Sequence, residues 1–122
     1  MENFCICGIR RIYKAIAQFE EQLQATLGLN LNEAMVLCLL SDNDCLSAGE
    51  IAEAMMLTRS NTSKVISSLE SASLIRRHLC KDDARCMRFS LTRNGVEKLS
   101  AVHCKQLQLP AELQQLVNHA KG

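Results

Sequence analysis

Aromatic residues are scarce in this sequence, whose 122 residues include three Phe, one Tyr and no Trp. A hydrophobic core must therefore be mainly aliphatic, and the hydrophobic share of 48% is enough to build one. A chain of this length forms one small domain, or one domain with short added helices. Because so short a chain buries only a modest fraction of its surface, association with a second copy would add burial.

Long hydrophobic runs are also missing. No segment approaches the roughly 20 apolar residues that a membrane-spanning helix needs. The N-terminal stretch MENFCICGIRRIYK has an acid at Glu2, and its basic residues follow the apolar part. This order is the reverse of that in a secretory signal. We therefore expect a cytoplasmic protein that does not enter a membrane.

Sequence signatures of catalysis are absent as well. The chain has no Gly-rich phosphate loop, no His-Glu-x-x-His zinc motif and no nucleophile elbow. It also shows no internal repeat and no low-complexity segment. We therefore predict that the protein is not an enzyme and that it needs no cofactor.

The formal net charge is only +1, but the charges are segregated along the chain. Residues 1–57 hold three basic and eight acidic residues, whereas residues 58–93 hold eight basic and three acidic residues. A basic segment in a near-neutral chain is typical of a surface that contacts a polyanion. The simpler interpretation, a solvated face with scattered charges, fits the composition alone equally well.

Hydrophobic periodicity predicts helices in the first two thirds of the chain. Apolar residues three or four apart over residues 8–27 indicate an amphipathic helix, and a second helix is expected after Asn30. The sequence SAGE at Ser47–Glu50 matches the capping box of a short third helix. A fourth helix is predicted over residues 58–74, with Thr58 as its N-cap.

After residue 74 the period changes from that of a helix to that of a strand. The runs IRRHLC and CMRFSL predict a β-hairpin, with the polar turn KDDAR between them. Thr92 can then cap a helix from about Gly95 to Leu107, and Pro110 suits the first position of a last helix. This order describes a mainly α fold with a small β-hairpin, namely a winged helix-turn-helix with N- and C-terminal helices added.

The fourth helix combines a hydrophobic face with many hydroxyl and amide side chains. Val65, Ile66 and Leu69 are spaced to face a core, yet Ser, Thr and Asn are mediocre helix formers. A solvent-facing helix would more often carry Glu, Lys and Gln in i,i+4 pairs, whereas Glu70 is the only acid here. Short polar side chains suit a helix that enters the major groove of DNA, which is about 12 Å wide.

We therefore predict a DNA-binding surface formed by this helix and the hairpin. Its residues are Arg59, Ser60, Asn61, Thr62, Ser63, Lys64, Ser67, Arg77, Lys81, Arg85 and Arg88. An arginine at the hairpin tip can enter a minor groove, and Asp83 is expected to orient such an arginine or to close the turn. The alternative is a winged-helix module that binds an acidic protein, although such a face would carry more exposed aromatic and aliphatic anchors.

Residues Leu46–Gly95 resemble the MarR family of bacterial transcriptional regulators. The resemblance rests on the order and spacing of S-x-x-E-I-A from Ser47, LI-R-R at the end of the fourth helix, D-x-R at Asp83–Arg85 and LT-x-x-G at Leu91–Gly95. It implies a homodimer that binds a pseudo-palindromic operator in double-stranded DNA, with repression as the expected mode. Ser60–Lys64 and Ser67 would then face the major groove, and Arg85 the adjacent minor groove.

The resemblance also implies a division of the chain and a form of regulation. Residues 1–29 would form an N-terminal dimerisation helix, residues 30–94 the winged helix, and residues 95–122 the C-terminal dimerisation helices. Many family members release DNA when a small aromatic ligand binds between the dimerisation and DNA-binding parts, so such an effector is expected here.

Seven cysteines are many for a chain of this length. Without a secretory signal, the simplest interpretation is reduced thiols that act as small hydrophobic side chains. Cys5 and Cys7 precede the first helix, where a thiolate is favoured, and a MarR subgroup senses organic peroxides through an N-terminal cysteine. Thiol oxidation at these two residues is therefore a second interpretation. A zinc site is a third, drawing on Cys5, Cys7, His103, Cys104 and His119, but no Cys-x-x-Cys pair supports it and we predict no metal.

Overall fold

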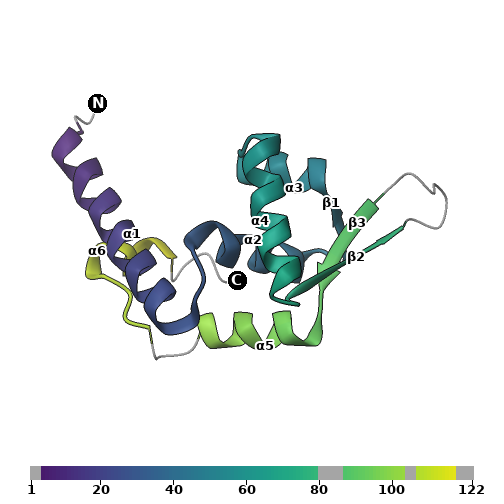
Figure 1. The fold of residues 1–122 in the computed structure, drawn as a ribbon. Coiled ribbons are helices and arrows are strands. Elements are labelled where there is room, and N and C mark those ends of the chain that lie inside the picture. Colours follow the sequence, from purple (N-terminus) through teal and green to yellow (C-terminus); the bar gives the residue numbers. More distant parts are fainter. Residues whose placement is uncertain (1–3, 80–86, 104–106, 118–122) are drawn as a thin grey trace. The chain divides into compact units, whose positions relative to one another are not determined.

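The structure is a computed structural model that describes residues 4–79, 87–103 and 107–117. Its elements are α1 (Ile6–Leu27), α2 (Leu31–Asp42), β1 (Leu46–Ser47), α3 (Ala48–Met55), α4 (Arg59–Ser71), β2 (Ile75–Leu79), β3 (Met87–Leu91), α5 (Arg93–Val102) and α6 (Ala111–Val117) (Figure 1). The prediction of a mainly helical chain with a small β-hairpin is confirmed. No single helix of the described ranges is long and apolar enough to cross a membrane; α1 and α2 pass that test only when counted together.

The chain divides into two compact units, the first containing α1 and α6 and the second running from Leu31 to His103. The second unit therefore includes α5. The boundary that the family resemblance places at residue 94 falls before most of this helix.

In the first unit, α1 packs against the segment that contains α6. Ala15 and Leu23 are the buried residues of α1, and Leu113 is the buried residue of α6. The side-chain amide of Gln22 donates to the carbonyl of Gln108 at 2.6 Å and accepts from the Gln108 N–H at 2.8 Å. These two hydrogen bonds fix the chain that leads into α6 against the C-terminal part of α1.

The second unit is a helical layer on a three-stranded antiparallel sheet of order β1-β3-β2. In the middle strand, Phe89 pairs with Leu46 of β1 on one side and with Arg77 of β2 on the other. The core is aliphatic apart from Phe89, as the composition predicts. Its buried hydrophobic residues are Ala34, Val36, Leu37, Leu40, Ile51, Val65, Ile66, Leu69, Leu74, Ile75, Phe89 and Leu99.

Three helices of this unit begin at the N-caps that the sequence predicts. The Ser47 hydroxyl accepts from the Glu50 N–H at 3.1 Å, and the Glu50 carboxylate accepts from the Ser47 N–H at 2.9 Å, which completes a capping box. The hydroxyls of Thr58 and Thr92 cap α4 and α5 by accepting from the Asn61 and Gly95 N–H groups at 3.1 and 3.0 Å. The prediction of the capping residues is therefore confirmed.

Two elements differ from the sequence prediction. The two-residue strand β1 was not expected, because its pairing with β3 spans more than forty residues and leaves no local pattern. Helix α5 ends at Val102 rather than near Leu107. The described segment after it contains no continuation of the helix.

Candidate nucleic-acid interface

Helices α3 and α4 and the turn between them form the helix-turn-helix. Met56 ends α3 in the left-handed conformation, with φ of 56° and ψ of 44°. The next N–H, that of Leu57, donates to the Ala52 carbonyl at 3.0 Å and closes the turn. The side chain of Thr58 then accepts from the Asn61 N–H at 3.1 Å and starts α4 in a new direction.

Helix α4 has one face in the core and one face in solvent. Val65, Ile66 and Leu69 are all at most 7% exposed, which confirms the predicted core face. The residues Arg59, Ser60, Asn61, Ser63, Lys64 and Ser67 are exposed, and we call this set the polar face of α4. The face presents hydroxyl, amide and cationic groups without an acidic side chain among them.

Thr62 does not belong to that polar face, so the prediction that its side chain faces outward is wrong. The residue is 2% exposed, and its hydroxyl donates to the carbonyl of Thr58 at 2.8 Å. This bond, to the carbonyl four residues earlier, is one that helical Ser and Thr commonly form. The spacing of Thr62 from Ile66 and Leu69 places all three on one side of the helix, so the sequence pattern did contain this information.

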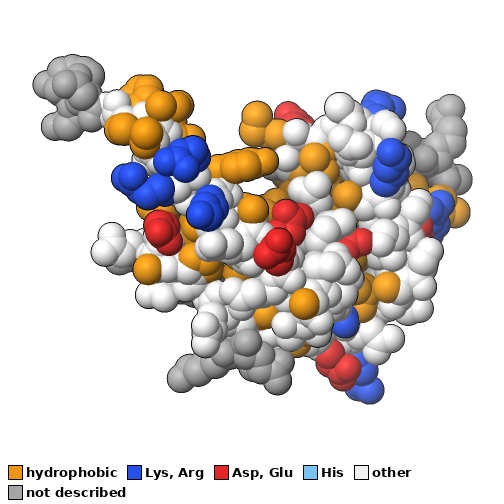
Figure 2. Space-filling model, turned by 60° about the vertical axis from the view of Figure 1, so that its left-hand side comes forward, with side chains coloured by type: hydrophobic (Ala, Val, Ile, Leu, Met, Phe, Trp, Pro, Cys, Tyr) orange, Lys and Arg blue, Asp and Glu red, His pale blue; other side chains and the backbone are white. Residues whose placement is uncertain are grey.

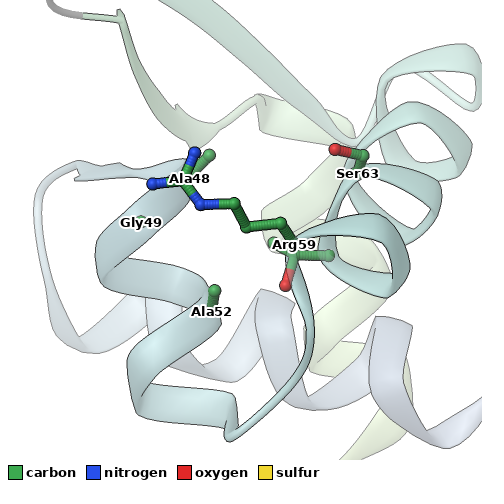
Figure 3. A pocket seen from close by; sticks show the side chains of 6 residues that line it. Ala48, Gly49, Ala52, Arg59 and Ser63 are labelled. Atoms are coloured by element: carbon green, nitrogen blue, oxygen red, sulfur yellow. The ribbon is translucent and has the colours of Figure 1, made fainter.

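Arg59 lies at the start of α4 beside a shallow pocket. The pocket has a volume of about 140 Å³ and is lined by Ala48, Gly49, Ala52, Arg59, Thr62 and Ser63. The Arg59 side chain extends over it from α4 toward Ala48 and Gly49 of α3 (Figure 3). The small side chains on α3 leave room for the guanidinium, which brings a positive charge to the junction of the two helices.

Arg77, one of the predicted DNA contacts, forms an intramolecular contact instead. Its Nε and Nη2 donate to the two carboxylate oxygens of Glu70, each at 2.7 Å. Its guanidinium also lies over the ring of Phe89, 5.5 Å from the centroid. The hydrogen bonds from Arg77 lower the pKa of Glu70, and the same bonds raise the pKa of Arg77. The pair joins β2 to the end of α4.

Arg88, on the middle strand β3, also forms an intramolecular ion pair. Its Nη1 donates to Glu50 Oε1 at 3.2 Å and to the Cys45 carbonyl at 3.3 Å. The pKa of Glu50 is lowered, first by the hydrogen bond from the Ser47 backbone and then by the charge of Arg88. Arg88 therefore lies against the start of α3 rather than free in solvent.

The remaining predicted hairpin residues, Lys81, Asp83 and Arg85, lie outside the described residues. Arg76, which is not among the predicted DNA contacts, is exposed on β2 and forms no ion pair with any described residue. Nothing local in the sequence separates Arg76 from Arg77. Only the contact of Arg77 with Glu70, seven residues earlier, distinguishes the two arginines.

The cysteines at the start of α1 are accessible. Cys5 and Cys7 are both exposed, and Cys5 is the N-cap residue of the helix. Hydrogen bonds from the backbone and side chain of Cys7 and from the Gly8 backbone lower the pKa of the Cys5 thiol. Among the described residues no group of three or more His, Cys, Asp or Glu side chains is arranged to hold a metal ion. Cys104 and His119 lie outside those residues.

Comparison with known proteins relates the chain to one family. Residues 29–87 match the model of the MarR family. The chain is 33% identical over 88 residues to the HTH-type transcriptional regulator PapX of Escherichia coli, which covers 70% of this chain and 54% of PapX. It is 29% identical over 96 residues to PrsX of the same species, which covers 77% of this chain and 55% of PrsX. The chain thus spans about half the length of the curated relatives it matches.

Solved structures share the fold. AbsC, a MarR family transcriptional regulator from Streptomyces coelicolor, is 25% identical with a TM-score of 0.73, over 100% of this chain and 86% of AbsC. BldR, a transcriptional regulator from Sulfolobus solfataricus, has a TM-score of 0.73 at 23% identity, over 94% of this chain and 78% of BldR. A MarR mutant from E. coli complexed with operator DNA has a TM-score of 0.69 at 19% identity, over 90% of this chain and 79% of that protein. The family match over residues 29–87, the relatives and the winged-helix fold together relate this chain to the MarR family.

Proposed function

We propose that the protein is a sequence-specific, DNA-binding transcriptional regulator that acts as a cytoplasmic homodimer on a pseudo-palindromic operator. Repression is the expected mode, and no catalytic activity is part of the proposal. The observation that carries it is the polar face of α4, held outward by the buried residues Val65, Ile66 and Leu69. An exposed helix of this composition, at the second position of a helix-turn-helix, suits insertion into the major groove.

Basic side chains that form no ion pair within the described part of the chain support this proposal. Arg59 and Lys64 on α4 and Arg76 on β2 are exposed and form no ion pair within the described part of the chain. They are therefore available to neutralise phosphates, which is the main source of affinity for duplex DNA. The polar face has no aromatic or aliphatic anchor of the kind that a protein-binding face uses, so the alternative of a protein-binding module is less well supported.

The relatives support the same function. PapX and PrsX carry the name of HTH-type transcriptional regulators, and one structural neighbour is a complex with operator DNA. The chain spans only about half of PapX and PrsX, so their function comes to this protein as part of the proposal.

Exposed hydrophobic residues on α1 support the homodimer. Ile6, Ile9, Ile12 and Tyr13 recur along one side of the helix and are 37–74% exposed, and we call them the α1 stripe. Figure 2 shows hydrophobic side chains exposed along this helix, with basic side chains beside them. Such a contiguous apolar surface is typical of an interface. A second copy of the chain is the occupant we propose.

Two forms of regulation belong to the proposal. Release of DNA by thiol oxidation at Cys5 is supported by the exposure of this thiol and by its lowered pKa, because the thiolate is the form that reacts with oxidants. Release by a small aromatic effector is supported by the family resemblance alone.

The test is a titration of duplex DNA from the region upstream of the protein's own gene, followed by fluorescence anisotropy at several salt concentrations. A phosphate contact contributes about 0.9 to the slope of log K against log salt, so Lys64→Ala should lower the slope by about 2 in a dimer that uses two copies. Lys64→Arg keeps the charge and should keep the slope. Absence of binding by the wild-type protein, or an unchanged slope in Lys64→Ala, would contradict the proposal.

A further inference from the structure

We infer that Arg88 is a positioning residue, which clamps the middle strand of the wing to the N-cap of α3 through Glu50, and that it does not contact DNA phosphate. The inference rests on the proposed function for the role of the wing in DNA binding. The clamp itself is a property of the free protein.

The register of the sheet places Arg88 where it can reach the first turn of α3. Arg88 of β3 is the direct partner of Ser47 in the short strand β1, and Ser47 is also the N-cap of α3. The Arg88 side chain therefore starts beside Ser47 and has to reach only to Glu50, three residues further along the chain. A two-residue strand that leads straight into a helix has little other support, so this side-chain contact matters to its position.

One carboxylate oxygen serves both the cap and the clamp. Glu50 Oε1 accepts from the Ser47 N–H at 2.9 Å and from Arg88 Nη1 at 3.2 Å. The same Nη1 donates to the Cys45 carbonyl at 3.3 Å, one residue before β1 begins. Arg88 thus bridges the residues on both sides of β1. Removing it leaves the carboxylate of Glu50 without its cation and the strand without its side-chain tether.

The local charge favours the same interpretation. The ion pair of Arg88 with Glu50 has no net charge, and Glu50 lies on α3, the first helix of the helix-turn-helix. A carboxylate close to DNA repels phosphate unless a cation compensates it. Arg88 supplies that compensation, so it adds no spare positive charge to the surface and releases no counterion of its own.

The second strand of the wing has an equivalent tether. Arg77 of β2 binds Glu70 of α4 through two hydrogen bonds of 2.7 Å. Each described strand of the hairpin is therefore joined by an arginine–glutamate pair to one helix of the helix-turn-helix, β2 to α4 and β3 to α3. The two ion pairs together fix the orientation of strands β2 and β3 relative to α4.

The test compares Arg88→Ala with Arg76→Ala, an arginine on the neighbouring strand that has no ion pair among the described residues. For Arg88→Ala we expect binding of the same upstream duplex to weaken about five- to thirty-fold, with the salt slope unchanged. Amide exchange of Ser47 and of the β1–β3 ladder should accelerate by a similar factor in the free protein. For Arg76→Ala we expect a salt slope lower by about 2 and unchanged exchange.

The outcomes separate this inference from the proposed function. A slope that falls by about 2 in Arg88→Ala, or exchange rates equal to those of wild type, would overturn the inference, whatever the affinity. If wild type binds no DNA, the proposed function fails while the exchange measurement still decides the clamp. Should Arg88→Ala not fold, Glu50→Gln replaces it, because glutamine keeps the capping bond and removes the anion. Faster exchange of the β1–β3 ladder then supports the clamp, and unchanged exchange refutes it.

Discussion

Gly95 is the position at which the smallest substitution should have the largest effect. The residue lies in the first turn of α5, and its N–H donates to the Thr92 hydroxyl at 3.0 Å. A Cβ added here would lie 2.1 Å from the carbonyl oxygen of Leu74 and 3.1 Å from Leu91 Cδ2. The backbone of Leu74 cannot yield easily, because its carbonyl also accepts from the Thr92 N–H at 3.1 Å. Gly95 in LT-x-x-G therefore permits α5 to start directly against the chain that links α4 to β2.

The change in the free energy of unfolding expected for Gly95→Ala combines two costs and one gain. Forcing extra volume into a packed site costs about 1–3 kcal/mol, and losing the Thr92–Leu74 hydrogen bond costs about 1 kcal/mol. Replacing glycine by alanine inside a helix returns about 1 kcal/mol. The clash wins, and we expect a loss of about 1–3 kcal/mol in the free energy of unfolding.

Urea denaturation followed by circular dichroism measures this loss, as a lower midpoint with an unchanged m-value. Gly49→Ala in helix α3 is the matched control, because a Cβ at Gly49 would meet only Ser47 Oγ, at 3.9 Å. That variant should be as stable as wild type or more stable by up to about 1 kcal/mol. A Gly95→Ala protein as stable as Gly49→Ala would refute the reasoning from the close approach to Leu74.

Two further predictions concern single residues. Met56 is 91% exposed and has a left-handed backbone conformation, which glycine adopts without strain. Met56→Gly should therefore raise the free energy of unfolding in urea titrations by about 0.5–1 kcal/mol. Met55→Gly, in the last turn of α3, should lower it by about 1 kcal/mol. Equal effects of the two would contradict the conformational argument. The lowered pKa of Cys5 increases its thiolate fraction at a given pH, so iodoacetamide should alkylate Cys5 faster than the exposed Cys38. Mass spectrometry of timed digests measures both rates, and equal rates would count against a reactive Cys5.

Local signals in the sequence predicted the helices, the hairpin and the starts of α3, α4 and α5. Ser47, Thr58 and Thr92 cap helices because a side-chain oxygen reaches an N–H three residues on, and this rule needs only neighbouring residues. The core face of α4 follows from helical spacing in the same way. The same spacing assigns Thr62 to the core face, where the structure places it.

The pairing of charges could not be predicted from the sequence. Arg77 meets Glu70 only because the chain turns between α4 and β2, and Arg88 meets Glu50 only because β3 pairs with β1. A count of basic residues treats Arg76, Arg77 and Arg88 alike, whereas the fold uses two of them internally. The contact of Gly95 with the Leu74 carbonyl is likewise set by tertiary structure, although the motif marked the glycine.

Covering of the α1 stripe by a second copy would make DNA binding depend on the concentration of the protein. If two copies cover this surface, the amount of assembled protein rises with the square of the concentration while single chains predominate. Occupancy of a two-fold site would then respond more steeply than linearly to synthesis and to degradation. The exposed α1 stripe would in this way set a threshold concentration, below which the protein does not occupy its DNA site.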